Sequence, residues 1–236
     1  MPHRPALIRI ALACLALLPC AAWSAPATYA LDPVHTRVVF AVSHAGFSDA
    51  IGTVSGSTGT LLFDPDDLAA TRVEVEVPLQ RLDLGDDAWN RATLGRRLLG
   101  ADDHPVARFT STRVESTAPG RARVTGMLEL RGVTREVTLD AVVNAHQRHP
   151  MPPFRRTLGF SASGVLSRGE FGIDAWASMI GDAVTLRIEA EATRTRAPAD
   201  APDADDDAGA PADEAGTDEV PAAPPAGDGE DPEPSR

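Results

Sequence analysis

The chain has 236 residues, of which 43% are hydrophobic, 24% are charged and 5% are aromatic, and its formal net charge is −12. This composition is typical of one globular domain with extensions and excludes a collagen-like chain, a bundle of membrane helices and a disulfide framework. Residues 197–236 hold 13 of the 34 acidic residues and one of the 22 basic residues, so residues 1–196 are close to neutral. A neutral domain with an acidic extension argues against partners such as nucleic acid or an anionic membrane surface.

Residues 1–24 are predicted to be an export signal. Arg4 and Arg9 precede an apolar run at residues 10–18 that is too short for a stable membrane anchor, and small residues allow cleavage after residue 24 or after residue 27. Both cysteines, Cys14 and Cys20, lie in this segment, so the exported chain has neither a thiol nor a disulfide. In a bacterium with two membranes, the expected location is the periplasm.

Residues 25–196 show the two-residue period of half-buried strands. Val73, Val75 and Val77 alternate with Glu74 and Glu76, which places valines and glutamates on opposite faces. Seven other segments show comparable strand patterns, and residues 131–135 have the features of a hairpin turn. These segments lie around residues 38–42, 59–63, 109, 124–130, 137–143, 158–162 and 184–190.

One segment, Asp86 to Leu99, breaks the alternation. It begins with two acids, ends with two arginines and is followed by Gly100, a pattern that favours a helix, although Gly95 lies inside it. One helix inserted among antiparallel strands predicts an all-β fold, as a barrel or a sandwich. We favour an antiparallel eight-stranded barrel, because closure removes exposed strand edges and eight strands can enclose one small ligand.

The segment 197–236 is predicted to be a disordered acidic tail rich in proline and alanine. Its only large apolar residue is Val220, so it cannot bury enough surface to offset its chain entropy. A solvating role is the simplest interpretation, and a partner-binding or cation-collecting arm is the alternative.

Catalytic and cofactor motifs are not evident. The sequence has no glycine-rich phosphate loop, HExxH, CxxC or GxSxG motif, so we predict neither an enzyme nor a cofactor. His146 and His149 are assigned to a surface loop rather than to a metal site, and His35 to a structural role in a turn. His44 shares the inward face of its strand, where it could be a core residue or could bind a ligand head group.

The predicted ligand-binding set consists of inward-facing residues of the barrel. Arg135 and Arg156 also have inward parity at strand ends and could bind an acidic head group, although a solvated guanidinium at the rim is the commoner outcome. The apolar members and the one histidine are Phe40, Val42, His44, Val75, Val77, Phe109, Leu128, Leu139, Phe160 and Leu186.

Six segments in order resemble the YceI-like lipid- or polyisoprenoid-binding family over about residues 28–192. They are Tyr29-x-Leu31-Asp32-x-x-His35-Thr36, residues 59–65, His104-Pro105 with Phe109-Thr110-Ser111, residues 126–134, Arg168-x-x-Phe171-Gly172-Ile173, and Gly181-Asp182-x-Val184. The resemblance implies a periplasmic, lipocalin-like barrel that holds a polyisoprenoid, a quinone tail or a fatty amide for transport or storage, without catalytic residues.

Three departures from the family pattern limit what the resemblance implies. Thr36 replaces a usual serine, Gly169-Glu170 replace Ser-Asp, and residues 90–94 replace a frequent Arg-Asp-x-His-Leu run. The last change could alter head-group preference if the helix borders the entrance. The alternatives are a ligand-free barrel acting in stress response or protein interaction and, less favoured, an enzyme with His44 or His35 as base. An oligomer is possible.

Overall fold

The computed structural model describes residues 26–195. The predicted export signal with its two cysteines and the predicted acidic tail lie outside the described residues, so both assignments stay predictions. What the structure describes is the segment in which the sequence shows alternating polarity.

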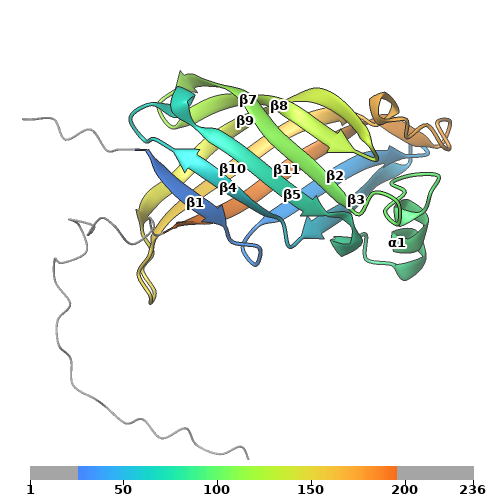
Figure 1. The fold of residues 1–236 in the computed structure, drawn as a ribbon. Coiled ribbons are helices and arrows are strands. Elements are labelled where there is room, and N and C mark those ends of the chain that lie inside the picture. Colours follow the sequence, from blue (N-terminus) through green and yellow to red (C-terminus); the bar gives the residue numbers. More distant parts are fainter. Residues whose placement is uncertain (1–25, 196–236) are drawn as a thin grey trace, which may run out of the picture. The chain divides into compact units, whose positions relative to one another are not determined.

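This segment forms a closed antiparallel barrel of eight strands, as the sequence predicts (Figure 1). The ring runs in the order β1, β4, β5, β7, β8, β9, β10 and β11, and a second pairing of β11 with β1 closes it. Closure leaves no free edge in the ring, which removes the exposed backbone groups that an open sheet presents. The ring strands are β1 (Ala27–Leu31), β4 (Thr58–Phe63), β5 (Arg72–Pro78), β7 (Val106–Ala118), β8 (Arg121–Leu130), β9 (Val133–Arg148), β10 (Arg156–Ser167) and β11 (Ile180–Arg194).

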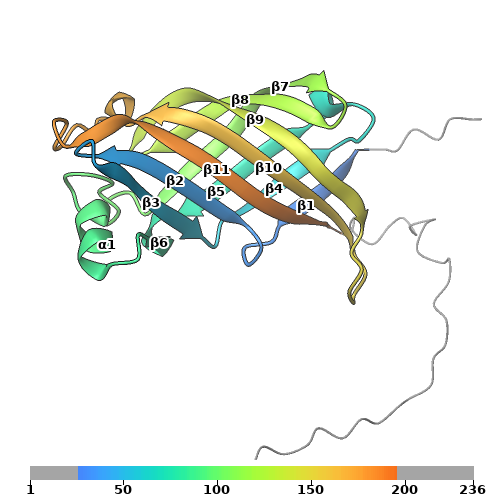
Figure 2. The same cartoon turned by 180° about the vertical axis from the view of Figure 1, so that it is seen from behind.

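Three further strands extend the barrel wall at one end. The long strand β11 pairs with β1 near its C-terminus and with β2 (Arg37–His44) over the rest of its length. The strands β1 and β2 therefore follow each other along the same edge of β11. Next to β2 lie β3 (Ser48–Ser55) and the short β6 (Leu82–Asp83). The wall therefore continues past the ring towards α1 (Figure 2).

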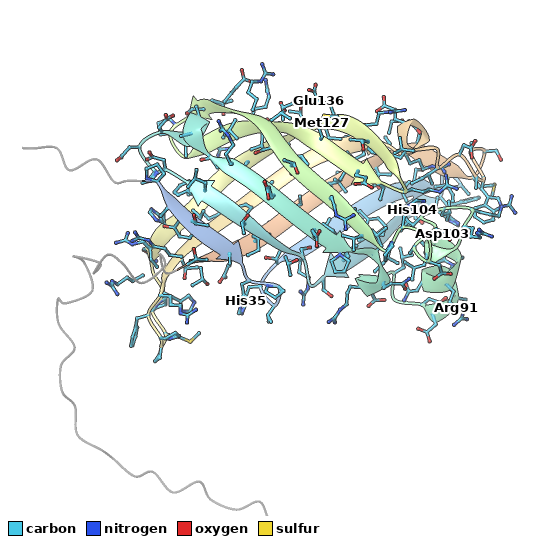
Figure 3. All side chains as sticks on the ribbon, viewed as in Figure 1. His35, Arg91, Asp103, His104, Met127 and Glu136 are labelled. Atoms are coloured by element: carbon cyan, nitrogen blue, oxygen red, sulfur yellow. The ribbon has the colours of Figure 1, made fainter. Side chains whose placement is uncertain are left out.

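Strand parity inside the barrel follows the sequence pattern. Met127 and Glu136, which the alternation places on the outer face, are directly paired between β8 and β9 and point away from the barrel (Figure 3). The two strands are joined by Arg131 and Gly132, both with positive φ, which is the geometry of a two-residue hairpin turn. The predicted hairpin is confirmed.

The predicted helix is present but shorter than expected. The helix α1 spans Asp87–Leu94, and the side chain of Asp86 caps it by accepting a hydrogen bond from the backbone N–H of Trp89 at 2.9 Å. It ends at Gly95, so the prediction that it continues to Leu99 was wrong, because a glycine inside a helix weakens it and residues 96–99 form a turn. Three short 3₁₀ helices complete the fold: η1 (Leu68–Ala70), η2 (Leu79–Arg81) and η3 (Gly169–Phe171).

The barrel has two different ends. At one end Tyr29, Phe63 and Leu158 are almost completely buried in a cluster around β1, β4 and β10, which we call the closed end. At the other end lie α1, the turn between β2 and β3, and the 168–180 segment between β10 and β11 (Figures 1 and 2). We call this second end the mouth.

Candidate ligand-binding cavity

The barrel encloses a cavity of about 630 Å³, within the range of roughly 300–1,000 Å³ found for small-molecule sites. Every strand of the ring except β1 contributes several apolar side chains to the wall, and β1 contributes Leu31. Ten of the twelve residues that the sequence singles out lie in this wall and are brought together by the fold. They are Phe40, Val42, His44, Val75, Val77, Phe109, Leu128, Leu139, Phe160 and Leu186.

The two predicted arginines lie outside the wall and far apart in the fold. Arg135 is exposed and donates a hydrogen bond to the backbone carbonyl of Thr134 at 3.0 Å. Arg156 is half-buried at the closed end, where its charge acts on Tyr29 and His146. Neither guanidinium lines the cavity, and contact of either with a head group stays a prediction.

Small residues explain why space remains inside the barrel. Gly52 is paired directly with Phe40, and a side chain at position 52 would collide with the ring of Phe40. Phe109 lies over Gly126 in the same way on β7 and β8. Because these glycines let the rings lie against the neighbouring strand, the phenyl groups cover the wall and leave the centre empty.

Polar groups within reach of a ligand are concentrated at the mouth. The wall also contains Thr36, Ser57 and Thr71, but their hydroxyl oxygens are buried and have no hydrogen-bond partner among residues 26–195. Ser43 and His44 are instead exposed at the end of β2. An amphiphile in the cavity would therefore find apolar surroundings along its length and polar partners only at the entrance.

The closed end contains a polar pair behind the apolar wall. The hydroxyl of Tyr29 and Nε2 of His146 are 2.6 Å apart, and both rings pack against Phe63. Burial lowers the pKa of His146, and the nearby charges of Arg156 and Arg194 lower it further; burial also raises the pKa of Tyr29. The prediction that His146 lies in a surface loop was wrong, because β9 extends to Arg148 and places this imidazole on the inner side.

The mouth is built from three segments that contact one another. The rings of His44 and Trp89 are 5.5 Å apart, which links β2 to α1. The backbone N–H of Ala45 donates a hydrogen bond to the carbonyl of Met179 at 2.5 Å, which links β2 to the 168–180 segment. Trp89, Trp176 and Met179 line the cavity and remain 42–50% exposed, so they form its entrance. The helix α1 therefore borders the entrance, which is the condition under which the departure from the family pattern at residues 90–94 could alter head-group preference.

Arg168 holds the 168–180 segment in place. The residue is only 6% exposed, and its guanidinium donates hydrogen bonds of 2.6–3.0 Å to the carbonyls of Ile173, Ala175, Ile180 and Gly181. Four carbonyls on one buried cation fix the path of residues 172–179, which belong to neither a helix nor a strand, and tie it to the start of β11. The sequence marks Arg168 only as part of a family motif, and this positioning role was missed.

Trp176 and Met179 were also missed by the sequence analysis. Their segment, residues 174–180, follows neither the two-residue nor the helical period. A signal was nevertheless present, since a run with tryptophan, methionine and isoleucine between two strands is unusually apolar for a loop.

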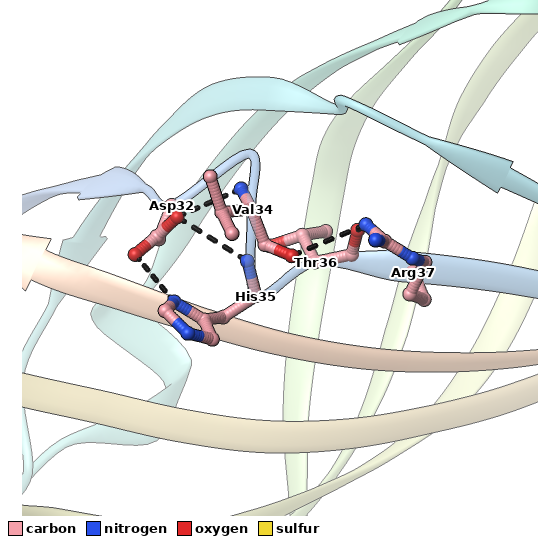
Figure 4. A network of polar contacts seen from close by, with 5 residues as sticks. All are labelled: Asp32, Val34, His35, Thr36 and Arg37. Atoms are coloured by element: carbon pink, nitrogen blue, oxygen red, sulfur yellow. Dashed lines mark hydrogen bonds and ion pairs between the residues drawn. The ribbon is translucent and has the colours of Figure 1, made fainter. Parts of the chain in front are cut away.

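His35 has a structural role in the turn between β1 and β2, as predicted. Asp32 accepts hydrogen bonds from the backbone N–H of Val34 at 2.8 Å and of His35 at 3.2 Å, and its other carboxyl oxygen lies 2.8 Å from the His35 ring (Figure 4). The hydrogen bond to Asp32 and that carboxylate's charge raise the pKa of His35. The imidazole is exposed and faces away from the cavity wall.

No cluster of three or more His, Cys, Asp or Glu side chains among residues 26–195 could hold a metal ion. No helix in the same range has the length and apolar character needed to cross a membrane.

Comparison with known proteins places the domain in a family. The family model of the YceI-like domain matches residues 29–192. A UPF0312 protein of Pseudomonas savastanoi pv. phaseolicola is 32% identical over 149 residues, covering 62% of this chain and 77% of the relative. A UPF0312 protein of Serratia proteamaculans is 30% identical over 162 residues, covering 69% and 83%.

Solved structures show the same fold at lower identity. BcnA of Burkholderia cenocepacia has a TM-score of 0.61 and 22% identity, covering 68% of this chain and 98% of BcnA. A polyisoprenoid binding domain from Saccharophagus degradans, implicated in plant cell wall breakdown, has a TM-score of 0.50 and 15% identity, covering 71% and 98%. The chain therefore belongs to the YceI-like domain family, also represented by the UPF0312 proteins.

Proposed function

We propose that the protein is a non-enzymatic carrier or store that holds one long apolar ligand in its barrel. The candidate ligands are a polyisoprenoid, a quinone tail and a fatty amide. The observation that carries this proposal is the cavity of about 630 Å³ whose wall is almost entirely aliphatic and aromatic. The relationship to a polyisoprenoid binding domain supports the same ligand class.

Burial of hydrocarbon is sufficient to give useful affinity without any charged contact. An apolar chain gains roughly 0.8 kcal/mol per buried CH₂, so three or four isoprene units gain about 12–16 kcal/mol. Association costs about 4–15 kcal/mol in lost translational and rotational freedom. Chain length therefore sets affinity, and the shape of the wall sets specificity.

We place the polar head of the ligand at the mouth. Ser43 and His44 are exposed at the end of β2 and also belong to the wall, whereas the other wall hydroxyls named above are buried. The hydrocarbon tail then lies along the barrel towards Phe63 and Leu158. This orientation leaves the closed end dry and the head group hydrated.

The location of this function is proposed to be the periplasm. The predicted export signal supports it, and a carrier with an enclosed cavity suits the aqueous space between two membranes, where a free prenyl chain would be insoluble. A native mass of the bound ligand would fix its chain length and its head group.

Native mass spectrometry and lipid extraction of the protein purified from its own host test the proposal. We expect a bound prenyl or acyl lipid, and uptake of added prenyl quinone by protein stripped of ligand. Reproducible absence of both would leave the alternative, a ligand-free barrel that serves as an interaction or stress-response module.

A matched pair of substitutions on β10 tests the cavity itself. Phe160→Arg places a guanidinium in the wall and should abolish uptake, because an unpaired charge in an apolar cavity is costly to desolvate. Val165→Arg changes a side chain that is 63% exposed on the outer face of the same strand, and it should leave uptake unchanged. Equal loss in both variants would contradict the assignment of the site.

A further inference from the structure

The mouth is surrounded by exposed apolar side chains, which we call the rim: Phe47, Trp89, Trp176 and Met179. Phe47 is 92% exposed at the tip of the turn between β2 and β3, and the other three are 42–50% exposed. Exposed apolar residues scattered singly are ordinary, whereas several gathered at one place mark a binding surface.

Backbone hydrogen bonds and one ring contact link the segments that contain the four rim residues. The backbone N–H of Phe47 donates to the carbonyl of His44 at 3.1 Å, and the His44 ring lies against Trp89. The N–H of Met179 donates to the carbonyl of Trp176 at 2.8 Å, and Met179 in turn accepts from Ala45. The rim therefore crosses all three segments of the mouth and continues directly into the wall of the cavity.

The chemistry of the rim fits the surface of a phospholipid bilayer. Two of its four members are tryptophans, whose amphipathic rings are favoured at membrane–water interfaces. The guanidinium of Arg97 lies 4.6 Å from the centre of the Trp176 ring, and no carboxylate among residues 26–195 forms an ion pair with it. An arginine in this position can reach lipid phosphate groups while the indole enters the interface.

We infer that the rim docks on a phospholipid bilayer and that the ligand passes between the bilayer and the cavity through this contact. The inference rests on the proposed function, because it concerns how the same ligand enters. A long prenyl chain is almost insoluble in water, and an apolar surface that runs from the rim into the cavity lets it move without crossing water. Apolar insertion drives the docking, so a zwitterionic bilayer is sufficient and the near-neutral domain needs no anionic lipid.

Tryptophan fluorescence can measure the docking of the rim on vesicles. In a chain carrying Trp23→Phe, the two remaining tryptophans, Trp89 and Trp176, both lie on the rim. Vesicles of dioleoylphosphatidylcholine should shift their emission to shorter wavelength, and the same lipid brominated in its acyl chains should quench it. Phe47→Asp in this background should reduce vesicle binding about tenfold or more, since it removes a phenyl group from the inserted surface.

Phe154→Asp is the matched control. Phe154 is 52% exposed in the loop between β9 and β10, at the closed end, so its replacement should leave quenching unchanged. Absence of quenching in the parent protein, or equal losses for Phe47→Asp and Phe154→Asp, would overturn the inference. A change in sedimentation mass caused by Phe47→Asp, without vesicle binding by the parent, would also overturn it by assigning the rim to a second copy of the chain.

Ligand uptake separates this inference from the proposed function. A quinone with a four-isoprene tail is supplied either from an ethanol stock or from phosphatidylcholine vesicles. We expect Phe47→Asp to slow uptake from vesicles about tenfold and to leave the equilibrium affinity measured from ethanol within about twofold. Equal vesicle rates would refute the docking surface alone, whereas failure of the parent protein to bind quinone by either route would refute the carrier.

Discussion

The two ends of the barrel use aromatic and polar residues in opposite ways. At the closed end Tyr29 is 1% exposed, Phe63 is 4% exposed and His146 is hydrogen-bonded to the tyrosine. At the mouth, Trp89 and Trp176 line the entrance of the cavity and are 46% and 42% exposed. Aromatic burial at the closed end stabilises the fold, whereas incomplete burial at the mouth leaves room for a ligand to enter.

The difference follows from how each end is held together. The closed end is made of paired strands, and the β1 pairings with β4 and β11 seal the ring there. The mouth is held by α1, a turn and the segment fixed by Arg168, with few ladder hydrogen bonds between them. Elements with few backbone pairings open at lower free energy than strands in a sheet, so we expect exchange of ligand to occur at the mouth.

The largest expected effect on stability lies at the closed end. Leu158→Ala removes a side chain that is 1% exposed, and it should lower the free energy of unfolding by about 2–5 kcal/mol because it leaves a void. Leu62→Ala, on the outer face of β4 and 39% exposed, is the control and should cost far less. Urea unfolding followed by circular dichroism measures both. Similar costs would show that the closed end is not the tightly packed one.

A smaller and more local effect is expected from Arg168→Met at the mouth. Four carbonyls lose a charged donor, but the segment can open and let water replace it, so we expect a loss of about 1–3 kcal/mol. Amide hydrogen exchange should accelerate in residues 173–180 and stay unchanged in β1 and β4. Arg187→Met, which changes an exposed arginine on β11, should affect neither region. Acceleration throughout the barrel would mean that Arg168 supports the fold as a whole.

The same contrast explains what could be predicted from the sequence. Alternation placed Val75, Leu128 and Leu139 correctly, because the inner and outer faces of a barrel strand see apolar and aqueous surroundings throughout. The strands β1, β3 and β6 were missed. In β3, Ile51 is 63% exposed and small residues face inward, which reverses the usual pattern. Polarity alternation therefore fails in β3, where Ala50 and Gly52 face inward and the larger Ile51 faces outward.

Contacts between distant segments could not be predicted. His146 and Tyr29 are 117 positions apart, and nothing near either residue indicates the other. The 168–180 segment likewise takes its shape from hydrogen bonds to Arg168, not from a periodic pattern. The ten wall residues were predictable because each depends only on its own strand, whereas the mouth depends on three segments meeting.

The smallest effect expected is a pH dependence of stability that separates the half-buried imidazole of His146 from the exposed one of His35. Burial, with nearby arginines, lowers the pKa of His146 below its ordinary value of about 6.5, so the unfolded chain binds a proton more readily than the folded one. Stability should therefore fall as the pH drops below about 6.5 towards the lowered pKa. For His35, whose pKa is raised by Asp32, the stabilising contribution is present below about 6.5 and is lost as the pH rises through the raised value.

Because the two windows lie on opposite sides of about pH 6.5, single substitutions can separate them. His146→Gln should flatten the decline on the acid side, and His35→Gln should flatten only the decline on the alkaline side. Thermal unfolding between about pH 5 and pH 8 measures both, since the carboxylates with lowered pKa values, such as Asp182, titrate below this range. An acid-side decline that persists in His146→Gln would show that protonation of this half-buried imidazole does not limit the stability of the closed end.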